Sequence, residues 1–74
     1  MVVLYMENRL KELRESLAMT QEELAARAGV SRQTIISLEK GKYNPSITLA
    51  YKLSKIFGLS IEELFMLNEG GEKI

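Results

Sequence analysis

The stretch of sequence that decides the fold is Gln21-Glu-Glu-Leu-Ala-Ala-Arg-Ala-Gly-Val-Ser-Arg-Gln-Thr-Ile-Ile-Ser-Leu-Glu-Lys40. Its apolar spacing predicts two short helices joined by a tight turn. Gly29 supplies the left-handed residue that lets the chain leave the first of these helices sharply. Ala25 is expected where the helices cross, because a larger side chain would push them apart. The other residues expected to fill the wedge between the helices are Leu24, Ala28, Val30, Ile35 and Leu38.

The second helix of this pair leaves one face outside the wedge. At about 100° per residue, that face holds Arg32, Gln33, Ile36, Ser37 and Lys40. The pattern predicts a helix-turn-helix, whose second helix enters the major groove of DNA. Arg, Gln and Ser side chains can hydrogen-bond base edges there, and an aliphatic side chain can contact a thymine methyl. We therefore expect base contacts from Arg32, Gln33, Ile36 and Ser37, although an incidental surface aliphatic is an open alternative for Ile36.

Groups suited to phosphate flank this helix. The first helix of the pair begins at Thr20 and Gln21, and its N-terminus offers free N–H groups and positive potential. Gln21 could also hold Arg32 or Gln33 of the second helix. Residues 27–55 contain six basic residues and one acidic residue, a net charge of +5, although the whole chain is neutral. Phosphate contacts position a protein on DNA without reading its sequence. The residues expected to make them are Thr20, Gln21, Ser31, Lys40, Lys42, Tyr43 and Asn44.

The composition excludes most chemistry at neutral pH. The chain of 74 residues is long enough for one domain (1–74), and it contains no Cys, no His and no Asp. It therefore has no imidazole base, no thiolate nucleophile and no ordinary zinc site. We expect a binding protein rather than an enzyme, with no cofactor and no bound metal.

The rest of the chain predicts further short helices, which gives an all-α fold of five helices. They are expected over residues 7–17, 21–28 and 31–40, between 46 and Gly58, and after residue 60. In the first helix, Leu10, Leu13 and Leu17 should face inward. Helix N-caps are expected at Thr20, Ser31, Ser46 and Ser60, with capping boxes completed by Glu23 and Glu63.

The two ends of the chain, residues 1–6 and 65–74, are expected to differ from the middle. Each contains an apolar run, at 2–5 and at 65–67, and the two runs could pair as a small antiparallel β-ribbon. Because a two-stranded ribbon is marginal on its own, it would pack on the helices or on a second subunit. The open alternative is two ends that are disordered or merely packed on the core.

The chain resembles the Xre/Cro-type helix-turn-helix transcriptional regulators, which have the lambda-repressor-like DNA-binding fold of five helices. The motifs that carry the resemblance are Asn8-Arg-Leu-Lys-Glu-Leu-Arg14, Thr20-Gln-Glu-Glu-Leu-Ala, Val30-Ser-Arg-Gln-Thr-Ile, Leu38-Glu-Lys-Gly-Lys-Tyr-Asn-Pro-Ser46 and Leu53-Ser-Lys-Ile-Phe-Gly. The resemblance is closest to short, single-domain members with a terminal β-ribbon. It implies DNA contacts at Gln21, Arg32, Gln33 and Ser37, and a structural ion pair between Arg14 and Glu39. Ile36 departs from the family, where a polar residue is common.

The resemblance implies a transcriptional repressor that binds double-stranded DNA at a palindromic operator as a homodimer. Its dimer interface is expected at Leu59, Ile61, Phe65 and Leu67, together with the N-terminal run. Without cysteine, an export signal or about 20 consecutive apolar residues, a cytoplasmic location is expected. Two other functions of the same fold stay open: an antitoxin or accessory regulator bound to a partner protein, and a module that bridges two proteins.

Overall fold

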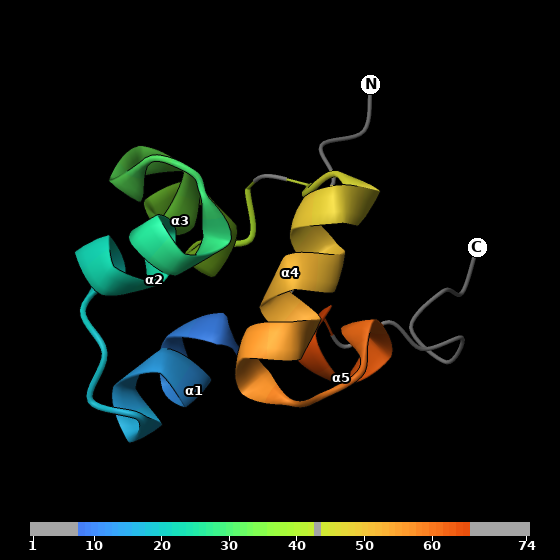
Figure 1. Cartoon of the computed structure of the whole chain (residues 1–74). Helices are drawn as coiled ribbons and strands as arrows, with labels where there is room; N and C mark the ends of the chain where they lie inside the picture. Colours follow the sequence, from blue (N-terminus) through green and yellow to red (C-terminus); the bar gives the residue numbers. More distant parts are fainter. Residues whose placement is uncertain (1–7, 43, 66–74) are drawn as a thin grey trace.

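The computed structural model describes residues 8–42 and 44–65, which form five α-helices and no strand. The helices are α1 (Leu10–Ser16), α2 (Gln21–Ala28), α3 (Arg32–Glu39), α4 (Ile47–Phe57) and α5 (Ile61–Phe65). In Figure 1, α2 and α3 lie together on one side of the molecule, α4 and α5 lie on the other, and α1 lies below α2. The prediction of an all-α fold with helices in this order is confirmed for these residues.

Hydroxyl side chains begin four of the helices. The Thr20 hydroxyl accepts a hydrogen bond from the Glu23 N–H, and the Glu23 carboxylate accepts one from the Thr20 N–H, so α2 begins with a complete capping box. Ser60 and Glu63 make the same two bonds at the start of α5. The hydroxyls that cap α3 and α4 through one backbone N–H each are those of Ser31 and Ser46. Each cap contributes about 1 kcal/mol to stability, and all four were predicted.

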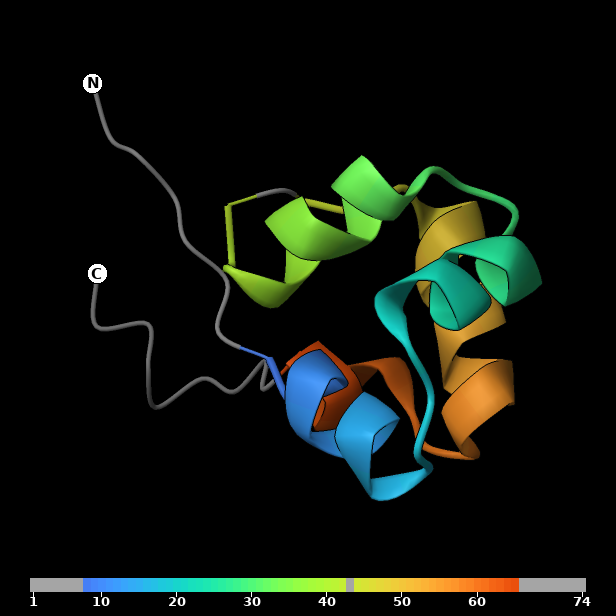
Figure 2. The ribbon, with the colours of Figure 1, turned by 90° about the vertical axis from the view of Figure 1, so that its left-hand side faces the viewer.

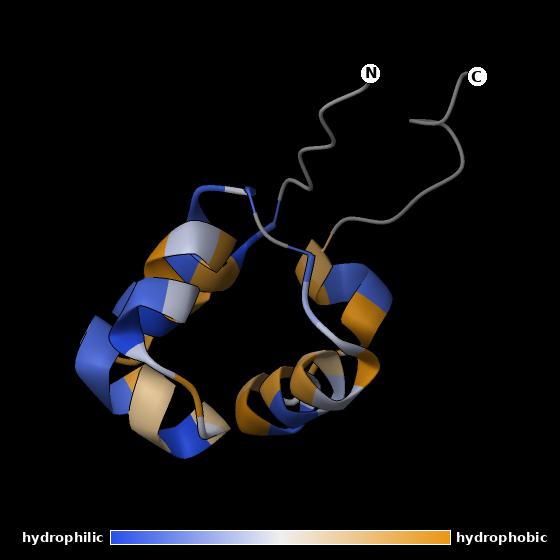
Figure 3. Ribbon diagram, turned by 90° about the horizontal axis from the view of Figure 1, so that it is seen from above, coloured by the Kyte–Doolittle hydropathy of each residue, from blue (hydrophilic) through white to orange (hydrophobic). Residues whose placement is uncertain are grey.

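One hydrophobic core joins the five helices. The side chains with no exposed surface are Leu10, Leu24, Ile35, Leu38, Leu53 and Leu64, and every helix contributes at least one of them. Figure 3 shows hydrophobic and hydrophilic residues alternating around the turns of the helices, as expected where each helix turns an apolar side to a shared core. Because Ile35 and Leu38 of α3 are part of this core, the packing of the other helices fixes the orientation of α3.

The C-terminal end of α1 differs from the prediction. We expected Leu17 to face inward, but the helix ends at Ser16 and Leu17 is 53% exposed. The reason is a left-handed Ala18, with φ 55°, which reverses the chain so that the Met19 N–H bonds the Arg14 carbonyl at 3.0 Å. This turn carries Met19 into the core, where only 8% of it is exposed.

The predicted terminal strands fall almost entirely outside the described residues. Phe65 is the one position of those strands that the structure describes. It is the last residue of α5 rather than the first of a strand, and it is 2% exposed. The helix that begins after the Ser60 cap places Leu64 and Phe65 together in the core, and this local geometry prevails over the β-propensity of the apolar run.

Candidate nucleic-acid interface

α2 and α3 are joined by a tight turn. Ala25 and Ala28 are only 4% and 1% exposed, and such small side chains allow neighbouring helices to approach closely. Gly29 ends α2 with φ 73°, and the Val30 N–H bonds the Ala25 carbonyl at 3.0 Å. Figure 2 looks onto this side of the molecule and shows α3 at the top, α1 at the bottom and the start of α2 between them. The geometry is that of the predicted helix-turn-helix.

The side of α3 that faces away from the core carries the residues predicted to read bases. Arg32 and Gln33 are exposed, and within the described part of the chain neither side chain has a hydrogen bond or an ion pair. Ile36 and Ser37 are half-buried, which is less exposure than their place on the helix had suggested. The first turn of α3 is therefore the part most available to a ligand.

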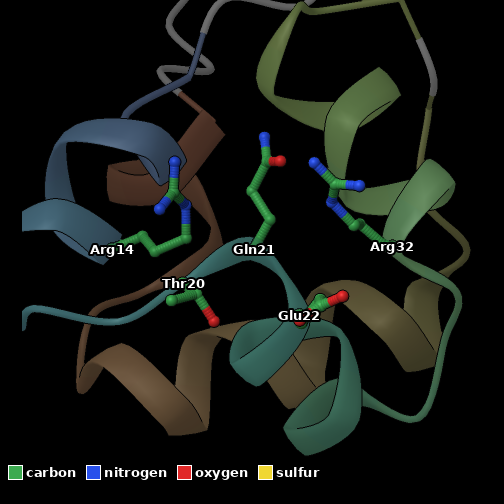
Figure 4. A pocket seen from close by; sticks show the side chains of 5 residues that line it. All are labelled: Arg14, Thr20, Gln21, Glu22 and Arg32. Atoms are coloured by element: carbon green, nitrogen blue, oxygen red, sulfur yellow. The ribbon is translucent and has the colours of Figure 1, made fainter.

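An open groove lies between α1, the start of α2 and the start of α3. Its lining side chains are Arg14, Thr20, Gln21, Glu22 and Arg32. Figure 4 shows the Gln21 side chain projecting between the two arginines. Glu22 was not predicted as a site residue, because an acidic residue in the first turn of a helix is ordinarily explained by the helix dipole. Its carboxylate is the one group in this lining that would repel an anion.

The residues predicted to bind phosphate form two groups in the structure. Thr20 and Gln21 share the groove with Arg32 at the N-terminal end of α3. Lys40, Lys42 and Asn44 are exposed and follow the other end of the same helix. Ser31 is exposed beside the first group and caps α3, and Tyr43 lies outside the described residues. Phosphate contacts from these positions would flank α3 at both ends.

Arg14 and Glu39 form the ion pair between α1 and α3 that the family resemblance implies. Arg14 Nε donates to Glu39 Oε2 at 2.6 Å, and Nη2 donates to Oε1 at 3.2 Å. The two side chains are 10% and 5% exposed, and Arg14 Nη1 also donates to the Met19 carbonyl at 2.8 Å. The hydrogen bond to Glu39 raises the pKa of Arg14 above its ordinary value. The guanidinium of Arg14 is therefore charged at neutral pH.

Gln21 bonds this ion pair, and it does not hold Arg32 or Gln33 as we had expected. Its Nε2 donates to Glu39 Oε1 at 3.2 Å. The two residues begin α2 and end α3, respectively, and are 18 positions apart in the chain. No local pattern could show this bond, because it depends on how the two helices are packed.

Two lysines of residues 27–55 lie on α4 and make contacts away from α3. Lys55 Nζ lies 5.5 Å from the centre of the Tyr51 ring, a cation–π contact. Lys52 Nζ lies beside Gly29 at the C-terminal end of α2, where the helix dipole favours a cation. The positive charge of residues 27–55 is therefore not concentrated on α3 alone.

The residues predicted to form the dimer interface differ in how much of their surface is exposed. Leu59 and Ile61 are half-buried and pack against the edge of the core. Phe65 is 2% exposed and lies in the core of its own chain, because it occupies the inner face of α5, which leaves it little surface for a contact between copies. Leu67 lies outside the described residues. Leu59 and Ile61 are thus the predicted interface residues that keep some exposed surface in the described part of the chain.

Within residues 8–42 and 44–65, no group of three or more His, Cys, Asp or Glu side chains is placed to hold a metal ion. No helix in the same part of the chain has the length and apolar character needed to cross a bilayer.

The fold and this site define the class of protein: a helix-turn-helix protein in which the first turn of α3 is exposed. The family described as Helix-turn-helix matches residues 10–64 of the chain. The chain belongs to this family, the Xre/Cro-type transcriptional regulators, which are DNA-binding proteins and not enzymes.

Two archaeal relatives and one solved structure match most of the chain over most of their own length. The chain is 56% identical over 64 residues to an uncharacterized HTH-type transcriptional regulator of Archaeoglobus fulgidus. The match covers 86% of this chain and 90% of that protein. It is 53% identical over 64 residues to a regulator of Methanocaldococcus jannaschii with the same description, covering 86% of this chain and 97% of that protein. Among solved structures, it resembles the restriction-modification controller protein C.AhdI of Aeromonas hydrophila, with a TM-score of 0.69 and 35% identity, over 77% of this chain and 86% of that one.

Proposed function

We propose that the chain is a sequence-specific transcriptional regulator that reads the major groove of DNA with α3 and represses transcription as a homodimer on a palindromic operator. The observation that carries the proposal is the pair Arg32 and Gln33, exposed and without a partner in the described part of the chain. They stand at the N-terminal end of α3, and in helix-turn-helix proteins this end contacts base edges.

The side-chain chemistry assigns a role to each position. Arg32 suits guanine O6 and N7, and Gln33 suits adenine N6 and N7, each through two hydrogen bonds. Ile36 and Ser37 are half-buried and would add contacts of shorter reach, to a thymine methyl and to a polar base edge. The positions proposed to bind phosphate on either side are Thr20, Gln21, Ser31, Lys40, Lys42, Tyr43 and Asn44.

A homodimer follows from the small size of this face. Two copies related by a two-fold axis would place their α3 helices in successive major grooves, about 34 Å apart. Leu59 and Ile61 are proposed for the contact between the copies, because they combine apolar surface with partial exposure. Bound in this way to promoter DNA in the cytoplasm, the dimer would block access by RNA polymerase.

The experiment has two stages. Duplexes bound by the wild-type chain are selected from a random pool, and the affinity for the selected duplex is then measured by fluorescence anisotropy. We expect two half-sites whose centres are about 10 base pairs apart. Arg32→Ala should weaken binding about ten- to a hundredfold for each copy, because each copy of the dimer loses a two-bond contact to a base.

The matched control is Arg27→Ala, which removes the same charge from an exposed position of α2. Arg27 lines a different groove, with Leu17 and Ala26 among its neighbours, and no residue lines both grooves. We expect a loss of less than about threefold for the control. Equal losses for the two variants would contradict the assignment of α3 as the reading helix, and selection of no duplex would contradict DNA binding itself.

A further inference from the structure

The carboxylate of Glu39 joins three helices at the edge of the groove. Its two oxygens accept hydrogen bonds from Arg14 on α1, at 2.6 and 3.2 Å, and from Gln21 at the start of α2, at 3.2 Å. The same carboxylate ends α3, and its side chain is 5% exposed. Gln21 is half-buried and lines the groove. The buried ion pair of Arg14 and Glu39 is therefore hydrogen-bonded directly to Gln21, whose side chain reaches the groove.

The carboxamide of Gln21 has two N–H groups on one nitrogen. One of them is used by Glu39, so the plane of the carboxamide is held in one orientation. The other N–H has no acceptor among residues 8–42 and 44–65 and remains for one outside the protein, and the side chain projects into the groove between Arg14 and Arg32 (Figure 4). A flexible glutamine would lose rotamer freedom when it bonded a phosphate, and this one has lost much of it in advance.

Charge explains why a carboxylate can serve at this place. An unpaired carboxylate behind a phosphate contact would repel the phosphate. Arg14 neutralises Glu39 with two N–H groups, and the Met19 carbonyl holds the same guanidinium through a third at 2.8 Å. Gln21 is thus held by the carboxylate of Glu39, and the ion pair that Glu39 forms with Arg14 has no net charge.

We propose that Glu39 is a positioning residue for Gln21, which it holds ready to donate to a DNA phosphate, and that Arg14 supplies the countercharge. The ion pair between α1 and α3 then contributes to DNA affinity as well as to the fold. This inference rests on the proposed function, because the phosphate belongs to the DNA bound by α3.

A double-mutant cycle tests the inference with the selected duplex. Gln21→Ala should weaken binding about tenfold for each copy in the wild-type background, because each copy loses one hydrogen bond to a charged group. In the Glu39→Met background no oxygen remains at this position to accept from Gln21, so Gln21→Ala should weaken binding less than about twofold. Circular dichroism at the assay temperature restricts the comparison to folded variants. Equal losses in both backgrounds would show that Glu39 is only structural and would overturn the inference.

A second measurement needs neither DNA nor a variant. Side-chain ¹⁵N relaxation of the free wild-type protein compares the carboxamide of Gln21 with that of Gln33, which is exposed and unpaired among the described residues. We expect an order parameter for Gln21 near the value of about 0.85 typical of rigid backbone, and one below about 0.6 for Gln33. A Gln21 carboxamide as mobile as that of Gln33 would overturn the inference even if the protein binds DNA. A wild-type chain that binds no duplex would overturn the proposed function, and this inference with it.

Discussion

Ala18 and Gly29 adopt the same left-handed backbone conformation, with φ values of 55° and 73°, at the ends of α1 and α2. In both turns the next residue donates its N–H to the carbonyl five positions back. This conformation is unfavourable by about 1–2 kcal/mol for a residue that carries a Cβ. The two turns on either side of α2 therefore have one geometry, but only the second has the residue that suits it.

Replacing Ala18 with glycine should stabilise the protein. Relief of the left-handed strain is partly offset by the greater freedom of glycine in the unfolded chain, so a net gain of about 0.5 kcal/mol is expected. For a domain of this size that raises Tm by about 2–4 °C, measured by circular dichroism. The control is Ala26→Gly, at an exposed position inside α2, which should lower stability by about 1 kcal/mol. A lower Tm for Ala18→Gly would contradict the left-handed turn.

Replacing Gly29 with alanine should destabilise the protein by about 1 kcal/mol in urea denaturation, because the new Cβ is strained at φ 73°. That Cβ would lie 3.4 Å from Lys52 Nζ, an ordinary contact that the flexible lysine tolerates. Gly58→Ala is the matched control, since Gly58 has φ 68° and open space around it. We expect similar losses for the two variants. A much larger loss at Gly29, restored by Lys52→Ala, would show that the lysine contact dominates.

The capping box of α5 should make stability depend on acid pH. The backbone hydrogen bond from Ser60 lowers the pKa of Glu63 from its ordinary value of 4.5. The folded state therefore binds the proton more weakly than the unfolded state, and Glu63 stabilises the fold above the ordinary value. This contribution is lost as the pH falls through the lower folded value.

Urea midpoints of wild type and Glu63→Gln, measured between about pH 3 and 7, test this prediction. The wild-type advantage should be present at pH 7 and shrink at the acid end. Glu62→Gln, at the neighbouring exposed position of α5, should leave the wild-type pH profile unchanged. An advantage of wild type over Glu63→Gln that does not change with pH would contradict a charged cap.

The salt dependence of DNA affinity distinguishes a lysine that contacts a phosphate from one that does not. If Lys42 binds phosphate, Lys42→Ala should reduce the slope of log affinity against log salt by about one per chain. Lys55→Ala is the control, because its ammonium lies over the Tyr51 ring, and it should leave the slope unchanged. The slopes come from anisotropy titrations at four or more salt concentrations. An unchanged slope for Lys42→Ala would remove it from the phosphate contacts.

Much of the fold follows from patterns that act over a few residues. Thr20 and Glu23 complete a capping box three positions apart, and the outward residues of α3 follow from helical periodicity. Such features need no knowledge of the rest of the molecule, because one turn of helix brings the partners together. The five helices, their caps and the exposure of Arg32 and Gln33 are therefore readable from the chain.

The remaining features depend on the packing of distant segments. Periodicity places Leu17 inward, yet the turn at Ala18 sends Met19 into the core instead. Glu22 enters the groove, and Gln21 finds a partner 18 positions away, only because α1, α2 and α3 meet around one core. Local patterns specify which way a side chain leaves its own helix. Which partner it meets is decided by the arrangement of the other helices, and that arrangement is set by burial of the core as a whole.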